Sequence, residues 1–251
     1  MGGTGLIGTR TVARLRADGH DVIDASRATG VNTYTAEGLP EAVDGADVLV
    51  DVTNPGYFDE KGATEFFEVS TLNLLTHGRA AGVGHHIALS VVGTDRLARS
   101  EGGYFAAKVV QEQLIRESGR PYSIVHSTQF FEFLKSIADA AAVGGRVRLA
   151  RARIQPIAAD DVAQALAVVV AGAPSQGVLE IAGPERFRLD EVIRERLRYA
   201  ADPREVLADP LARYFGARLD EDELLPSNGA RIAATRLRDW LDAGDLTGMP
   251  A

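Results

Sequence analysis

The sequence contains no cysteine, which excludes disulfides, thiolate metal ligands and a cysteine nucleophile. It also lacks an apolar run of the ~20 residues that a membrane-spanning helix needs. Basic residues are in deficit: 27 lysines and arginines against 35 acidic residues give a net charge of −8. This balance argues against nucleic-acid binding, because phosphate contacts require a concentrated basic surface. The densest basic stretch has the spacing of a solvated strand face and comprises Arg146, Arg148, Arg151 and Arg153.

Almost nothing precedes the first motif. Met1 alone stands before a glycine-rich loop in which Gly2, Gly5 and Gly8 have the spacing of a dinucleotide loop. Backbone without Cβ atoms lets a pyrophosphate approach, and the next helix directs its N–H groups and positive dipole end at the anion. In a Rossmann-type fold this loop follows the first, central strand. We therefore expect that strand to be missing from the chain as given, and hypothesise that the true start lies upstream. The loop also stands where a signal peptide would be, so we expect a cytoplasmic protein.

Segments of helical and strand character alternate along the chain. The 251 residues, 45% of them hydrophobic, suffice for one globular domain. The pattern predicts an α/β fold, a doubly wound parallel Rossmann-type sheet with a small C-terminal substrate-capping part. We expect residues 1–127 to form the dinucleotide-binding core, and residues 128–251 to form the rest of the sheet and the cap within a single integrated domain. Helices are expected over 9–17, 60–81, 104–117, 130–142, 161–170 and 189–199, with a short helix or turn over 40–44. In the helix over 60–81 the expected apolar face comprises Phe66, Val69, Leu72 and Leu75. Strands are expected over 20–25, 46–52, 87–89, 122–126, 147–150 and 178–181.

Three residues have the pattern that hydride chemistry requires. Tyr104 and Lys108 are four residues apart on an expected helix, so they share one face. Ser90 ends an expected strand, at the carboxyl edge where open α/β sheets bind ligands. A phenol titrates near ~10, and a nearby ammonium favours the phenolate, so Tyr104 could exchange a proton with a carbonyl or alcohol. We expect Ser90, Tyr104 and Lys108 to form a catalytic set.

Together, GGTGLIG, LSVVG and YxxxK resemble the short-chain dehydrogenase/reductase superfamily, and in particular its atypical NmrA-like, NAD(P)H-binding branch. The later segments TQFFEF (128–133), QPIAADDVA (155–163) and IAGPERF (181–187) resemble that branch too. The resemblance implies Tyr104 as acid/base, Lys108 as ribose ligand and Ser90 as the residue that orients the carbonyl. The expected cofactor contacts are Gly2, Thr4, Gly5, Leu6, Ile7, Gly8, Ser26, Arg27, Val52, Thr53 and Lys108.

The chain departs from the family pattern at two further places. Phe67 stands where extended members have an asparagine that supports a proton relay, and Asn73 matches a later, structural asparagine. His126 and Ser127 replace the Arg-Pro that is usual in members with sugar substrates. These departures disfavour the relay and a sugar-nucleotide substrate, and they leave cofactor binding intact.

The end of the second expected strand indicates the cofactor. Ser26 occupies the place where NAD-preferring relatives have aspartate, and Arg27 supplies positive charge for a 2′-phosphate. This favours NADP, with NAD as the alternative, since a register shift of two residues would bring the Asp24 carboxylate to the site.

The leading functional hypothesis is an NAD(P)H-dependent oxidoreductase acting on a small carbonyl or quinone-like substrate. The alternatives are a non-catalytic NADP(H) sensor that binds a regulatory protein, and a sugar-nucleotide epimerase or dehydratase. A homodimer or a protein partner stays open. The histidines lack metal-ligand spacing, so no metal is expected. Pocket lining and plain packing are equal alternatives for His126. For Tyr57 and Phe58 the equal alternatives are covering the nicotinamide and packing within their loop. Phe130, Phe131 and Phe133 are expected to be mostly core, with one of them and Gln129 near the substrate. The pair Asp160 and Asp161 is expected to cap a helix.

Overall fold

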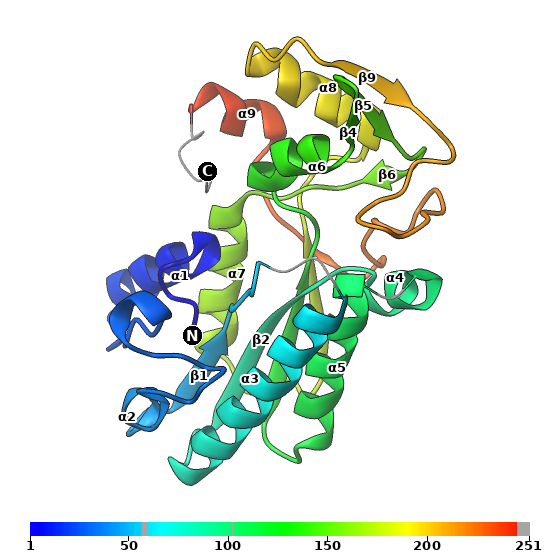
Figure 1. Cartoon of the computed structure of the whole chain (residues 1–251). Helices are drawn as coiled ribbons and strands as arrows, with labels where there is room; N and C mark the ends of the chain where they lie inside the picture. Colours follow the sequence, from blue (N-terminus) through cyan, green and yellow to red (C-terminus); the bar gives the residue numbers. More distant parts are fainter. Residues whose placement is uncertain (57–59, 102, 245–251) are drawn as a thin grey trace.

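The computed structural model describes residues 1–56, 60–101 and 103–244, and its centre is a parallel sheet. Five strands lie in the order β1-β2-β3-β7-β10, all parallel to their neighbours (Figure 1). Their bounds are β1 Val48–Asp51, β2 His85–Val91, β3 Tyr122–Ser127, β7 Val178–Ala182 and β10 Arg231–Ile232. The expected doubly wound α/β fold is confirmed.

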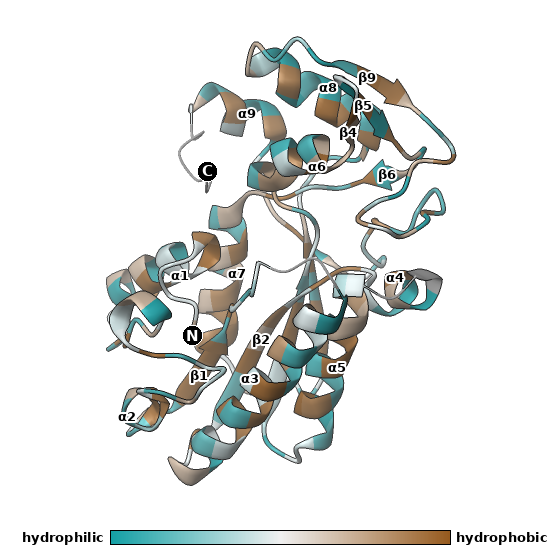
Figure 2. Cartoon of the chain, viewed as in Figure 1, coloured by the Kyte–Doolittle hydropathy of each residue, from teal (hydrophilic) through white to brown (hydrophobic). Residues whose placement is uncertain are grey.

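Helices cover both faces of this sheet, because strands buried on both sides need two apolar layers. On one face α3 (Glu60–Ala80) packs against α5 (Gly103–Glu117), and on the other α1 (Leu6–Ala17) packs against α7 (Ala159–Val170). In Figure 2 the strands are largely brown, whereas α3 alternates between brown and teal along its length. The short helices η1 (Arg27–Thr29), α2 (Leu39–Val43) and α4 (Thr94–Glu101) complete this half; the expected helix over 40–44 is confirmed, whereas α4 was not predicted.

Residues 20–25 do not form the strand that the sequence predicts. The backbone around Met1 occupies the position between this segment and β1: the Met1 amine donates to Val50 O (2.7 Å), and Met1 O accepts from Val52 N (3.1 Å). On the other side Gly2 N donates to Ala25 O (2.9 Å). A strand requires a partner along its whole length, and Met1 and Gly2 supply one only at the carboxyl end. The propensity of residues 20–25 is therefore overridden by the lack of a neighbouring strand.

The buried face of α3 differs from the predicted one. The predicted apolar stripe included Phe66 and Leu72, yet Leu72 is 45% exposed while Phe67 is 1% exposed. The helix is rotated so that Phe67 and Leu74 face the sheet and α5. Two small residues share this face: Ala63 packs with Phe67 and with Ala107 of α5, and Gly78 faces Val83 and Leu49.

The second half of the chain adds a smaller layer above the carboxyl ends of the sheet (Figure 1). Its core joins Phe131, Leu134, Val192 and Trp240, among others. A three-stranded sheet has the order β4-β5-β9, and β6 pairs with β8. The bounds are η2 Phe131–Phe133, α6 Leu134–Ala140, β4 Ala142–Val143, β5 Arg146–Leu149, β6 Arg153–Ile154, β8 Phe187–Arg188, α8 Leu189–Tyr199, β9 Glu205–Ala208 and α9 Leu237–Asp242.

Three of the four arginines of the basic stretch are paired with acids on the surface of this layer. Arg146 contacts Glu205 (3.0 Å), Arg148 contacts Asp209 (2.9 Å) and Arg153 contacts Asp222 (2.6 Å). A strand face neutralised in this way agrees with the expected solvated face and offers no row of free cations for phosphates. Within the described part of the chain, no helix combines the length and apolarity required to cross a bilayer.

Candidate functional site

The glycine loop is fixed at the carboxyl end of β1 by contacts that exclude side chains. A Cβ on Gly8 would lie 2.0 Å from the Gly2 carbonyl oxygen, closer than any atom can approach. Gly2 itself has φ +80, and a Cβ there would lie 2.9 Å from Val52 O. Gly5 N closes the turn by donating to Gly2 O (3.0 Å). The loop is thus a tight backbone cradle in which glycine is required for steric reasons.

The helix that follows the loop has an N-terminus suited to an anion. Gly5 is its N-cap and offers no side-chain hydrogen bond, and no acidic residue lies in its first turn. The first N–H groups of a helix have no intrahelical acceptor, and its dipole is positive at this end. Thr4 and Gly5 are exposed, while Ile7 and Gly8 are buried below them. The structure thus brings together the loop residues expected to contact a pyrophosphate: Gly2, Thr4, Gly5, Leu6, Ile7 and Gly8.

The end of β1 joins this loop to helix α5. Val52 is hydrogen-bonded to Met1, and Asp51 precedes it with its side chain 1% exposed. One Asp51 carboxylate oxygen accepts from Thr53 N (2.9 Å) and Thr53 Oγ1 (2.7 Å). The other accepts from Gln111 Nε2 on α5 (2.9 Å). Val52 and Thr53, both expected near the cofactor, therefore lie between the loop and α5.

Lys108 is buried beside Gln111, with its side chain 2% exposed. Its Nζ donates to Leu89 O on β2 (2.8 Å) and to Gln111 Oε1, and it lies 4.5 Å from the centre of the Phe67 ring. Burial lowers the pKa of Lys108 to about 8, while the charges of Asp51 and Glu112 act in the opposite direction. Phe67, at the position of the relay asparagine, thus covers the ammonium with an aromatic face.

Tyr104 lies one turn before Lys108 on α5, as the spacing predicts. Its ring makes edge contacts with Phe67 (5.9 Å between centroids) and Phe105 (5.8 Å). Burial raises the pKa of the Tyr104 phenol, and the nearby Asp51 charge raises it further. The phenol is therefore neutral in this structure and able to donate a proton.

Ser90 belongs to a different buried cluster. Its Oγ donates to Glu112 Oε1 (2.5 Å), which also accepts from His126 Nε2 (2.8 Å). Ser90 and His126 are register partners on β2 and β3, so both side chains reach the same point of α5. Arg116 Nη2 donates to the other oxygen of Glu112 (2.6 Å). His126 is thus engaged in packing and hydrogen bonding.

The carboxylate of Glu112 is ionised in this cluster. Burial by itself would raise its pKa, but hydrogen bonds from His126 and Ser90 and the charge of Arg116 lower the pKa below its usual value. Among the described residues no hydrogen bond joins Ser90, Tyr104 and Lys108. The three lie on adjacent elements, β2 and α5, but each polar group has its own environment.

Residues at the end of segment 20–25 lie next to the loop. Ser26 is buried, and its backbone N–H donates to Thr29 Oγ1 (2.8 Å), whereas Arg27 is exposed. The Asp24 side chain packs against Gly3, where a Cβ would lie 1.9 Å from Oδ1, and that buried oxygen has no hydrogen-bond partner. The Asp24 carboxylate therefore lies against the glycine loop, and the exposed Arg27 follows it three residues later in the chain.

The structure also locates other residues that the sequence singled out. Phe131 is 1% exposed, whereas Phe133 is 38% exposed and stacks on Phe130 (5.4 Å). Gln129 is 9% exposed and both polar atoms of its amide lack partners.

Asp160 and Asp161 lie in the first turn of α7, where the N-cap is Ala158; the prediction that they cap the helix is therefore wrong in position. Tyr57 and Phe58 lie outside the described residues. Within the described ranges, no cluster of three His, Asp or Glu side chains could hold a metal.

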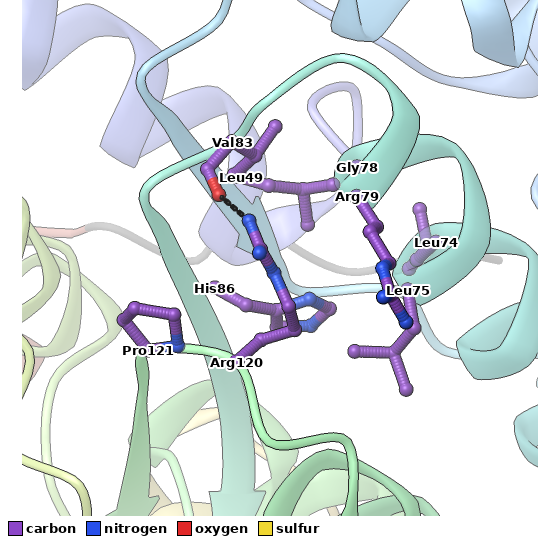
Figure 3. Close-up of a pocket in the computed structure, with 9 residues that line it drawn as sticks. All are labelled: Leu49, Leu74, Leu75, Gly78, Arg79, Val83, His86, Arg120 and Pro121. Carbon is purple, nitrogen blue, oxygen red and sulfur yellow. Dashed lines mark hydrogen bonds between the residues drawn. The ribbon is translucent and has the colours of Figure 1, made fainter.

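A small cavity lies between α3 and the amino end of β2 (Figure 3). It measures about 10 Å³, enough for about one water molecule, and the imidazole of His86 reaches it from β2. Its size and its distance from the glycine loop exclude it as a dinucleotide site. Its lining residues are Leu49, Leu74, Leu75, Gly78, Arg79, Val83, His86, Arg120 and Pro121.

Three buried polar residues of the site were not predicted: Asp51, Gln111 and Glu112. Asp51 has a signal in the sequence, because it interrupts the aliphatic run of an expected buried strand. Gln111 and Glu112 lie three and four residues after Lys108, and therefore on its helix face. A polar face on a helix that packs against a sheet is the pattern that could have identified them.

Comparisons with known proteins identify the fold. The sequence matches no protein-family model and no curated protein. Among solved structures, it is similar to MoeE5 in complex with UDP-glucose and NAD (TM-score 0.73, 17% identity, covering 96% of this chain and 94% of that one). It is also similar to Bordetella bronchiseptica WbmH in complex with NAD+ (TM-score 0.69, 15% identity, 99% and 98% covered). A third is dTDP-4-dehydrorhamnose reductase from Bacillus anthracis in complex with NADP (TM-score 0.69, 14% identity, 97% of each chain covered). At these identities the likeness establishes a shared Rossmann-type fold.

Proposed function

We propose that the protein is an NAD(P)H-dependent oxidoreductase of the atypical short-chain type, related to the NmrA-like branch. The proposal rests on one observation above all: the anion-binding loop and the Tyr104–Lys108 face of α5 meet at the end of β1. Val52 is bonded to the loop side, and Asp51, the residue before it, is bonded to Gln111 beside Lys108. The names of three similar structures include NAD or NADP, which supports a nicotinamide cofactor here.

Each residue then has a defined task. The loop from Gly2 to Gly8 and the first turn of α1 hold the pyrophosphate through backbone N–H groups. Lys108 binds the nicotinamide ribose, and Tyr104 donates its phenolic proton to the substrate oxygen. A bound nicotinamide cofactor would supply the hydride, which together with the proton from Tyr104 would reduce a carbonyl to an alcohol. Ser90 orients the carbonyl once its hydroxyl turns away from Glu112, so this role requires breaking the Ser90–Glu112 hydrogen bond.

The cofactor preferred in this proposal is NADP, with Arg27 on the 2′-phosphate. Asp24 beside Gly3 supports the alternative, NAD, because a carboxylate there can accept from a ribose hydroxyl. Replacing Arg27 by alanine separates the two cases. If NADP is the cofactor, R27A weakens NADPH binding about tenfold and leaves NADH binding unchanged. If the affinity for NADPH does not change, Arg27 has no role in cofactor choice.

The test of the enzyme is a fluorescence titration with NADPH and NADH, followed by NADPH oxidation with a panel of carbonyls and quinones. Tyr104→Phe is expected to lower turnover by about 10²-fold or more while cofactor affinity is kept. Tyr122→Phe is the matched control, since its phenol lies on β3 and is bonded to Gln176 O (3.2 Å). Full activity in the Tyr104 variant would refute the acid/base role.

A non-catalytic NADP(H) sensor is the second candidate, and it has specific support. The pKa of Tyr104 is raised rather than lowered, and the hydroxyl of Ser90 is bonded to Glu112. A sensor needs the loop and Lys108 but no acid/base residue. In that case the protein binds cofactor but shows no turnover, and Tyr104→Phe leaves the cofactor affinity unchanged. The names of similar structures also include sugar nucleotides, but His126, at the position of the sugar-binding arginine, is bonded to Glu112 here.

A further inference from the structure

Asp51 fixes the orientation of the Gln111 side chain. The two carboxylate oxygens of Asp51 face only N–H and O–H groups, and they accept hydrogen bonds from them. Asp51 Oδ1 accepts twice from Thr53, and Oδ2 faces the Gln111 amide at 2.9 Å. The nitrogen of that amide must therefore point at Asp51. With Gln111 1% exposed and held in α5, its oxygen must point the other way.

That amide oxygen faces the Lys108 ammonium, to which it is hydrogen-bonded. Lys108 is thus in contact with a neutral acceptor, although two carboxylates lie nearby. Asp51 approaches from β1 through Gln111, and Glu112 lies on α5 itself, bonded to Ser90, His126 and Arg116. Tyr104 on α5 is neutral, β2 supplies the Leu89 carbonyl, and α3 supplies the Phe67 ring without a charge. The amide therefore links Asp51 to Lys108 with a defined direction.

We propose that Asp51 and Gln111 are positioning residues of the nicotinamide site: the Asp51 carboxylate sets the direction of the Gln111 amide, and the amide oxygen holds the Lys108 ammonium toward the ribose. This inference rests on the proposed function. Neither residue touches the cofactor; both act through Lys108. The network Thr53–Asp51–Gln111–Lys108 also connects the end of β1, next to the glycine loop, to the acid/base helix.

The hydrogen-bond directions predict an unusual pair of substitutions. In Asp51→Asn, Thr53 N–H still needs an acceptor, so the nitrogen of the new amide faces Gln111. The Gln111 amide then reverses, and its N–H groups point at the Lys108 ammonium, which is unfavourable. Adding Gln111→Glu restores the pattern: the new carboxylate accepts from the amide introduced at position 51 and from Lys108. The double variant contains the same net charge as the native chain, with the carboxylate moved from β1 to α5.

The chain offers a direct measurement, because Lys61, Lys108 and Lys135 are its only lysines. In protein labelled with ¹³C-lysine, three side-chain signals titrate, and Lys108→Met assigns the buried one. The native Lys108 signal is expected to titrate with a pKa of about 8. In Asp51→Asn the midpoint falls by about one pH unit, since an opposite charge that favoured the ammonium is gone. In the double variant the midpoint returns to the native value or rises above it.

Two further variants keep the experiment decisive if Asp51→Asn folds poorly. Gln111→Met removes the hydrogen-bond acceptor of Lys108 and places no N–H group against the ammonium. It is expected to lower the titration midpoint of Lys108 as well. Gln113→Met is the matched control: the same change on the same helix, at an exposed residue bonded to Glu117 (2.8 Å). A Lys108 midpoint that is equal in native, Asp51→Asn and Gln111→Met proteins would overturn the proposal.

Cofactor titration separates this proposal from the proposed function. NADPH affinity is expected to fall about tenfold in Asp51→Asn and to recover in the double variant. A shifted midpoint with unchanged affinity in Asp51→Asn would refute the positioning role while leaving the enzyme intact. If native protein binds neither NADPH nor NADH, the proposed function and the positioning role fail together, and the lysine titration still decides whether Asp51 is coupled to Lys108.

Discussion

Replacing Gly8 by alanine is expected to damage the loop and the cofactor site together. Gly8 lies within α1, where alanine is normally the better residue by ~1 kcal/mol. Here the new Cβ would lie 2.0 Å from Gly2 O and 2.7 Å from Gly3 Cα, whereas ordinary contact begins at 3.4 Å. Both neighbours are backbone atoms, so no side-chain rotation can relieve the clash.

The size of the effect follows from these contacts. Forcing an extra carbon into a packed site costs ~1–3 kcal/mol, which outweighs the helix preference. Because both close contacts are with backbone atoms, we expect the upper end of this range, which leaves a net loss of about 2 kcal/mol in the free energy of unfolding, or roughly 4–8 °C in Tm for a chain of this size. The loop must move by about an ångström, which displaces N–H donors to the pyrophosphate. Losing one hydrogen bond to a charged group weakens NADPH binding at least tenfold.

The assay is a thermal melt and a cofactor titration on three proteins: native, Gly8→Ala and Gly84→Ala. Gly84 is the control, because a Cβ there meets only Asp47 O at 3.6 Å, an ordinary contact. The control is expected to bind NADPH like the native protein. A Gly8→Ala protein with native Tm and native affinity would refute the steric reasoning. A lowered Tm with native affinity would show that the loop is structural only, and the cofactor site would have to be sought elsewhere.

Three more predictions concern stability. Burial lowers the pKa of His86 to about 4, below that of the unfolded chain, so the unfolded state takes up the proton first as the pH falls below 6.5. The free energy of unfolding, measured by urea titration, should therefore decrease by about 2 kcal/mol between pH 7 and 4.5. If a His86→Leu protein shows the same decrease over this pH range, another group is responsible. Glu112→Gln should lower the free energy of unfolding by about 2 kcal/mol at pH 7, less than the ~3–5 kcal/mol of a fully buried pair because Arg116 is 35% exposed. Since the pKa of Glu112 is lowered in the folded protein, the stability difference between native and variant should shrink as the pH falls through that pKa. The control is Glu117→Gln at an exposed position of the same helix. A five-residue segment rich in β-branched residues, added before Met1, should pair with residues 20–25 and β1 and raise the Tm by several degrees. Amide exchange at residues 22–25 should slow at the same time. Exchange as fast as in the unextended chain would mean that no strand forms.

Local signals predicted most of the elements. The helix over 104–117 and the helix over 189–199 agree with α5 and α8 to within one residue, because caps, glycine stops and periodicity are properties of adjacent residues. The strand over 20–25 was wrong because pairing depends on a neighbour that no local pattern contains. The face of α3 was wrong because the buried residues are those that meet partners on other elements: Phe67 meets Tyr104 of α5, and Leu74 packs in a cluster with Leu49 of β1. The strands β6, β8 and β10 were missed because two-residue strands leave no periodicity to detect.

The sequence by itself determined the glycine loop, the uncapped helix after it, and the shared helix face of Tyr104 and Lys108. These features depend on backbone sterics and on spacing within one element. The tertiary structure alone decided that Asp51 reaches Gln111, 60 positions away, and that Ser90 and His126 share the carboxylate of Glu112. Such partners are set by which strands pair and in which register. A buried polar group must find a hydrogen bond wherever the fold provides one, and that choice is made only when the sheet and its helices have assembled.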